Sequence, residues 1–195
     1  MIALPKLPFN MDALSPYISG ETLCFIHQKI MPSYVDALPT PKKPISFLHY
    51  LSKIEDGSIG YRSATELYHH GFWLYHIKPN GGGQPSDFMQ NRILEDFGSF
   101  EKFRLEFLKH IKHPDTHWIW LAEQAGKLSV VATSTEGILS LGYKPIAVCN
   151  LCTHAYYLDY RDRKADYVTA YLEHLIDWQR AEMALTGADL WVWQS

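Results

Sequence analysis

Cysteine is scarce in this sequence, with three residues among 195, so the chain cannot encode a disulfide framework. No apolar run approaches the roughly 20 residues of a transmembrane helix, and the N-terminus lacks the basic and then apolar order of a secretory signal. The formal net charge is only −3, which provides no attraction to nucleic acid or to an anionic membrane. We therefore expect a cytoplasmic protein, in a reducing compartment, without a nucleic-acid or membrane partner.

Aromatic residues, by contrast, are abundant. They make up 14% of the chain and include six Trp and twelve Tyr. Such rings can fill a hydrophobic core, a dimer interface or the surroundings of a metal ion, so their number alone favours none of these. Hydrophobic residues (47%) and charged residues (20%) occur in the proportions of an ordinary globular protein.

The first part of the chain carries the pattern of an amphipathic helix. Ser19 is a candidate N-cap, and the pattern predicts a helix from there towards Leu38. Pro32 lies inside this stretch and should kink or locally break it. The apolar positions that recur at near-helical spacing are Leu23, Ile26, Ile30 and Tyr34.

A second helix is predicted in the aromatic and His-rich run that ends at His76. The sequence Ser63-Ala64-Thr65-Glu66 has the form of a capping box at the start of this run. In that arrangement Ser63 caps the helix and the Glu66 side chain bonds back to the cap.

Residues 80–83, with three consecutive glycines, force a loop, and we place a domain boundary there. The division predicts an N-terminal helical hairpin domain over residues 1–80 and a C-terminal α/β domain over residues 81–195. Helices followed by a three-stranded antiparallel sheet and a closing helix define the α+β class. The predicted C-terminal elements are helices capped by Ser86 and Ser99 with a break at Gly98, strands over 118–122, 128–133 and 145–150, and a final helix over 165–185.

Five short segments spread over nearly the whole chain form one consistent set. They are the arm at 4–19, the loop at 79–85, Phe97-Gly98-Ser99-Phe100, Trp118-Ile119-Trp120-Leu121, and His154-Ala155-Tyr156-Tyr157-Leu158-Asp159-Tyr160-Arg161. Their order and spacing resemble the iron/manganese superoxide dismutase family, and the last segment is the most specific. The resemblance implies a helical hairpin, an α/β domain and one iron or manganese ion between them. It also implies a homodimer with the active sites near the interface.

The family holds its metal with three His and one Asp, and by the resemblance only two of these four ligands have a matching residue in this chain. His70 and His154 match two of the His ligands. Ile26 stands where the first-helix His is expected, and Asn150 stands where the Asp is expected. His27 could replace the lost ligand only if the helix rotated, because one helical step turns a side chain by about 100°.

These replacements change the donor atoms of the expected site. Isoleucine has no donor atom, and an amide oxygen is a weaker and uncharged donor compared with a carboxylate. Loss of the negative charge should disfavour the trivalent metal. Residues 151–153 also differ from the family, which carries there a Trp beside the metal and a Glu that bridges to the partner. We expect impaired metal binding.

Glu66 and Tyr34 are further candidate site residues. Glu66 matches a family Gln that bonds the metal-bound solvent, and it lies at i, i+4 from His70. With His154 these residues could form a set of two His and one carboxylate, a ligand type suited to Fe(II). Alternatively, Glu66 merely completes the capping box. Tyr34 matches the family's gateway Tyr, a catalytic residue that orders solvent and guides protons.

The sequence Cys149-Asn150-Leu151-Cys152 is a lone CxxC followed by His154. Zinc binding or redox chemistry is one interpretation. Adjacent strand residues face opposite sides, so we favour buried thiols and do not favour zinc.

Two functions remain open on the sequence. In the first, which we favour, the chain is a degenerate dismutase kept as a homodimer with a binding or structural role. In the second, it is an active iron- or manganese-dependent enzyme, either a weak superoxide dismutase or a related oxidoreductase that uses Glu66, His70 and His154.

Overall fold

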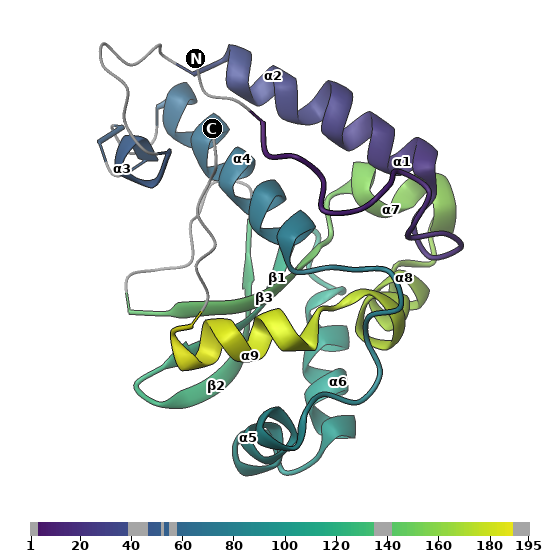
Figure 1. The fold of residues 1–195 in the computed structure, drawn as a ribbon, viewed down its shortest axis with the longest axis vertical. Helices are drawn as coiled ribbons and strands as arrows, with labels where there is room; N and C mark the ends of the chain where they lie inside the picture. Colours follow the sequence, from purple (N-terminus) through teal and green to yellow (C-terminus); the bar gives the residue numbers. More distant parts are fainter. Residues whose placement is uncertain (1–3, 39–46, 52, 55–57, 135–141, 189–195) are drawn as a thin grey trace.

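The computed structural model describes residues 4–38, 47–51, 53–54, 58–134 and 142–188. Helices from the N-terminal part lie beside a small sheet that is flanked by the later helices (Figure 1). Within the described part of the chain, no helix has both the length and the apolar character to cross a membrane. The elements are α1 (Gly20–Phe25), η1 (Ile26–Ile30), α2 (Met31–Asp36), α3 (Phe47–Leu51), α4 (Ile59–Tyr75), α5 (Asp87–Phe97), α6 (Phe100–His110), β1 (Trp118–Gln124), β2 (Lys127–Thr133), β3 (Lys144–Asn150), α7 (Thr153–Tyr160), α8 (Lys164–Ala170), η2 (Tyr171–Leu175) and α9 (Trp178–Thr186).

The first helical run begins as predicted and changes its winding before Pro32. The Ser19 hydroxyl accepts a hydrogen bond from the Thr22 N–H at 3.1 Å, which confirms Ser19 as the N-cap. In η1 the chain adopts a π-helical turn, in which the Met31 N–H reaches back to the Ile26 carbonyl. A proline lacks the N–H of a helical donor and crowds the preceding turn, and a wider turn before it relieves the crowding. The predicted break is therefore a π turn, after which the helix continues as α2 (Figure 1).

Helix α4 begins earlier than predicted. Its N-cap is Ser58, whose hydroxyl accepts from the Tyr61 N–H at 3.0 Å. Ser63 lies inside the helix and is buried, so the capping box predicted at Ser63 and Glu66 is wrong. Because α4 packs against α2, the two form the helical hairpin.

The sheet has the strand order β2-β1-β3, and both pairings are antiparallel. The central strand β1 is buried from Trp118 to Ala122, so both of its faces are covered. Helices α5 and α6 contact β2, whereas α4 and α9 contact β3. The predicted three strands and the α+β class are confirmed.

The single closing helix predicted over 165–185 is wrong. The chain forms α8 and the π turn η2, becomes extended at Ile176, and resumes as α9. Ile176 pairs with Ile77 in an isolated β-bridge. The glycine loop packs against this break, where a Cβ on Gly82 would lie only 2.1 Å from the Glu173 backbone. A tertiary contact, which local periodicity does not encode, thus interrupts the helix.

Polar contacts join α1 to α7 across the two parts of the chain. One carboxylate oxygen of Asp159 accepts from the Ser19 N–H at 3.1 Å and from the Thr22 hydroxyl at 2.9 Å. The Tyr160 hydroxyl donates to the Tyr17 carbonyl at 2.9 Å. These bonds fix α7, and with it His154, relative to the first helix.

Candidate functional site

Two histidines from different parts of the chain meet in the structure. His70 lies on α4 and His154 lies in the first turn of α7, and their Nε2 atoms are 2.8 Å apart. The rings are nearly parallel, with centroids 5.1 Å apart. The structure therefore brings together the two sequence-predicted histidines, with nitrogen facing nitrogen.

The hydrogen bonds of His70 determine which nitrogen carries its proton. The Nδ1 of His70 lies 2.7 Å from the Glu66 backbone carbonyl, which can only accept, so Nδ1 donates. In a neutral ring, Nε2 of His70 then accepts and Nε2 of His154 donates. Burial, aided by neighbouring His154, holds the pKa of His70 well below its ordinary value. Burial lowers the pKa of His154 to about 4, so both rings are neutral near pH 7.

The first-helix position contributes no donor. Ile26 is fully buried in the hydrophobic core. The neighbouring His27 is committed elsewhere, because its Nε2 donates to the Pro5 carbonyl of the N-terminal arm at 2.9 Å. The π turn thus leaves the alkyl side chain inside and the imidazole against the arm.

Asn150, the last residue of β3, uses its side-chain oxygen locally. Its Oδ1 accepts from the Cys152 backbone N–H at 2.9 Å, and this bond shapes the connection into α7. The amide Nδ2 is buried and has no hydrogen-bond partner among the described residues. The amide oxygen that would have to replace a carboxylate ligand therefore already accepts one hydrogen bond, and it carries no negative charge.

Glu66 is buried on the Nδ1 side of His70. Its Oε1 accepts from the Trp118 indole N–H at 3.2 Å, and its Oε2 lies 3.9 Å from the His70 Nδ1. Burial raises the pKa of Glu66 to about 7, although the Trp118 bond opposes this shift. The contact between Trp118 and Glu66 was not predicted from the sequence. The only signal for it was the indole N–H of a Trp in a predicted strand, for which the sequence indicated no acceptor.

Two more aromatic side chains adjoin the histidine pair. The Tyr34 ring lies 5.5 Å from the His70 ring, and burial raises the pKa of its hydroxyl. His69 packs edge-on against Trp118 and Trp120, with both centroid distances at 5.0 Å. Burial lowers the pKa of His69 to about 3, so this ring is also neutral.

The thiols of the CxxC sequence are buried, as predicted. Cys149 is fully buried and Cys152 is nearly so, and both are free of disulfide bonds. Burial raises the pKa of each thiol. Within the described ranges, no group of three or more His, Cys, Asp or Glu side chains converges in a way that could hold a metal ion.

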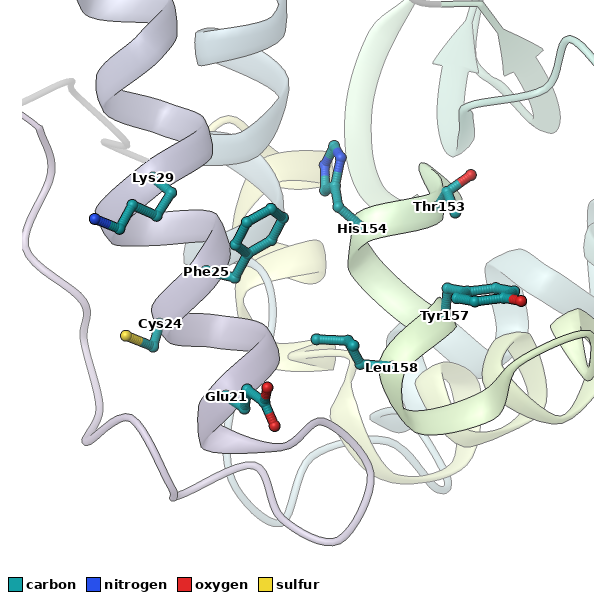
Figure 2. A pocket seen from close by; sticks show the side chains of 8 residues that line it. All are labelled: Glu21, Cys24, Phe25, Lys29, Thr153, His154, Tyr157 and Leu158. Atoms are coloured by element: carbon teal, nitrogen blue, oxygen red, sulfur yellow. The ribbon is translucent and has the colours of Figure 1, made fainter.

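A pocket of about 720 Å³ opens beside His154, between α1 and α7. Figure 2 shows Phe25 and Leu158 projecting into the space between the two helices, with His154 at one end of it. Phe25, Tyr157 and Leu158 are 43%, 48% and 41% exposed, which is high for large apolar side chains. Sequence analysis missed this pocket because the two walls come from helices more than 100 residues apart.

Comparisons with known proteins match both parts of the chain. Residues 2–75 match the alpha-hairpin domain of the iron/manganese superoxide dismutases, and residues 85–184 match the C-terminal domain of the same family. The chain belongs to the iron/manganese superoxide dismutase family. The family suggested by the sequence segments is thereby confirmed.

Curated members of this family are similar to the chain over nearly its whole length. Superoxide dismutase [Mn/Fe] of Rickettsia bellii is 34% identical over 193 residues, which cover 94% of this chain and 92% of the relative. Superoxide dismutase [Fe] of Synechococcus elongatus is 35% identical over 195 residues, which cover 95% and 97%. Superoxide dismutase [Fe] of Salmonella typhimurium is 35% identical over 186 residues, which cover 90% and 94%.

The residues present do not fit a four-ligand iron or manganese ion. The two Nε2 atoms are suitable donors, but Ile26 offers none and the Asn150 oxygen is bonded to the Cys152 N–H. No carboxylate among the described residues joins the two imidazoles from the side of their Nε2 atoms. A trivalent ion would also need the negative charge that an amide lacks.

Proposed function

We propose that this member of the iron/manganese superoxide dismutase family has little or no dismutase activity and keeps the fold for a binding or structural role. The observation that carries the proposal is the donor set at the metal position. Two imidazoles bond to each other, an alkyl side chain occupies the third ligand position, and an engaged amide occupies the fourth. A redox ion needs more donors than this set supplies.

The surroundings of the histidine pair support the same proposal. Glu66 accepts from Trp118 and lies on the Nδ1 side of His70, so it does not replace the missing carboxylate. Tyr34 stays beside His70, as expected of a gateway residue, but without a held metal it has no bound solvent to order. We assign Tyr34, His70, His154, Asn150 and Glu66 to the remnant of the active site.

A homodimer is part of this proposal. The family resemblance implies a homodimer, and the exposed apolar side chains of Phe25, Tyr157 and Leu158 line one pocket. Exposed apolar surface of this kind is typical of protein interfaces. Sedimentation of the purified chain measures its oligomeric state directly, and a monomer at micromolar concentration would contradict this part.

Restoring the lost ligands tests the proposal. The unmodified protein should contain iron and manganese well below one ion per chain and should consume superoxide slowly. The double variant Ile26→His with Asn150→Asp should gain near-stoichiometric metal, because it supplies an imidazole and a carboxylate in the missing positions. The single variant Asn150→Asp is the matched control, since three donors still leave one position open. Elemental analysis and a superoxide consumption assay provide the readouts.

Active dismutation is the second candidate function, and one observation favours it. His70 and His154 come together from the two parts of the chain, and the family resemblance matches both to metal ligands; relatives of the chain are named superoxide dismutases. Under this candidate the substrate is superoxide and the cofactor is iron or manganese. One tightly held ion per chain together with rapid superoxide consumption in the unmodified protein would establish it and remove the first proposal.

A further inference from the structure

The two facing imidazoles have the arrangement of metal ligands even though they do not suit iron or manganese. The Nδ1–H of His70 is held by the Glu66 carbonyl at 2.7 Å, which fixes the ring and directs its Nε2 lone pair at His154. A bond of this kind to the outer nitrogen is what orients ligating histidines in metalloproteins. For an ion to bind between the rings, the proton on the Nε2 of His154 must move to its Nδ1, a change of tautomer that leaves the ring neutral.

The remaining surroundings limit which ion these two donors can hold. Ile26 contributes an alkyl group, the Asn150 oxygen already accepts from the Cys152 N–H, and the Glu66 carboxylate accepts from Trp118. Iron, manganese and zinc require four or more ligands in stable protein sites. A monovalent ion with a filled d shell is satisfied by two donors in line. Its single charge also costs less to bury without a neutralising carboxylate.

We propose that the Nε2 atoms of His70 and His154 form a two-coordinate site for monovalent copper, Cu(I). The proposal rests on the proposed function in one respect, because the position must be free of iron or manganese. It specifies the chemical class of the ligand in the proposed binding role, namely a soft monovalent cation. No redox step is part of it.

The pocket beside His154 provides the room that this site needs. The Nε2 atoms are 2.8 Å apart, whereas two metal–nitrogen bonds of about 2.0 Å in line require a separation of about 4 Å. His70 is fully buried and cannot move away, so His154 must swing outward by about 1 Å. In the single chain, His154 is only partly buried and lines the open pocket, which gives it space to move and gives the ion a path of entry (Figure 2).

A cysteine near the same pocket is the main competitor for the ion. Cys24 lines the pocket, its thiol is free, and thiolates bind Cu(I) strongly. Its sulfur donates to the Gln28 side chain at 3.3 Å and points away from His154 in Figure 2. The variant Cys24→Ser therefore distinguishes binding by the histidine pair from binding by this thiol.

The experiment is an anaerobic titration of the metal-free full-length protein with Cu(I), in competition with a chromophoric Cu(I) chelator. We expect one ion per chain and a loss of affinity of at least about 100-fold in His154→Gln, since even outer-shell losses cost 10- to 100-fold. Cys24→Ser should keep the affinity of the unmodified chain. In the unmodified protein, the imidazole ¹⁵N resonances of His70 and His154 should shift on copper addition, and this readout requires no variant to fold.

Absence of binding, or unchanged resonances of both histidines, overturns the proposal. So does copper that is lost in Cys24→Ser and retained in His154→Gln. Iron and manganese are measured in the protein as purified, before the metal is stripped. Stoichiometric iron or manganese at that stage counts against the proposed function, whereas the titration of the stripped protein decides the copper site separately.

Discussion

At the junction of α1 and α7, the polar groups that hold the two helices together are paired, whereas around His70 several buried polar atoms are not. Asp159 satisfies both the Ser19 N–H and the Thr22 hydroxyl. Around His70, the Oε2 of Glu66, both ring nitrogens of His69 and the Nδ2 of Asn150 have no hydrogen-bond partner among the described residues. A buried polar atom without a partner costs free energy, so within the described residues the polar groups around His70 are less well satisfied than those of the α1–α7 junction.

The contrast separates a junction whose polar contacts are made from a region whose buried polar groups lack them among the described residues. The junction also brings His154 to His70. The two regions should therefore respond differently to mutation.

Glu66→Gln should have the largest effect on stability, and it should stabilise. Burial raises the pKa of Glu66 to about 7 from the ordinary 4.5, so the folded chain binds the extra proton between these values. The free energy of unfolding therefore falls as the pH rises from 4.5 to 7. Gln cannot ionise, so at pH 8 the variant should be more stable than the unmodified chain by about 3 kcal/mol, and below pH 4 the difference should vanish.

Urea unfolding of metal-free protein at several pH values measures this difference. Glu101→Gln is the matched control, because Glu101 is an exposed side chain at the start of α6, and it should change stability by less than about 0.5 kcal/mol at every pH. If Glu66→Gln lowers the free energy of unfolding equally at pH 4 and pH 8, the ionisation of Glu66 does not determine the stability of this region.

Asp159→Ala should have the next largest effect, in the opposite direction. The change removes the acceptor of two hydrogen bonds and leaves the Ser19 N–H and the Thr22 hydroxyl without it. Bonds to a charged acceptor contribute about 1.5–3 kcal/mol, so we expect a loss of about 2 kcal/mol in urea unfolding. Asp162→Ala, an exposed change close by in sequence, should be neutral within about 0.5 kcal/mol. Equal losses of stability in Asp159→Ala and Asp162→Ala would show that the two hydrogen bonds of Asp159 do not stabilise the α1–α7 junction.

Ser19→Ala should have the smallest effect of the three. It removes the N-cap bond to the Thr22 N–H but leaves the backbone contact with Asp159 intact. Loss of such a cap costs about 1 kcal/mol. Ser33→Ala, at an exposed serine inside α2, is the control and should stay within about 0.5 kcal/mol. The thermal unfolding midpoints of the two variants, measured side by side, test this expectation.

Much of the fold could be predicted from the sequence because its signals are local. Ser19, Ser86 and Ser99 each accept from an N–H three residues on, as expected for N-caps, and Gly98 adopts the left-handed conformation that ends α5. The start of α4 was misplaced because Ser63 and Glu66 have the spacing of a capping box, while Ser58 makes the actual bond. The closing helix was predicted without its break, because the bridge between Ile77 and Ile176 is a contact across about 100 residues.

The residues of the site could be predicted from the sequence, but the hydrogen bonds that they form could not. The family segments identified His70 and His154, and the structure places their Nε2 atoms together. The bond from the Cys152 N–H to the Asn150 oxygen is a local one of the kind that Asn side chains favour, although its effect on a metal position cannot be seen in the sequence. The bond from Trp118 to Glu66 joins residues 52 apart, so it is set by tertiary packing rather than by local spacing.

The π turn of η1 makes the first helix tolerant of a change in length. Its defining bond joins Met31 to Ile26 across five residues, one more than an α-helical bond spans. Deleting one residue between them would restore ordinary α-helical winding while Ile26 kept its place relative to Met31. In a regular α-helix the same deletion would turn everything upstream by about 100° and pull Thr22 away from Asp159. The segment therefore holds one spare residue, which can be lost without turning the face that α1 presents to α7.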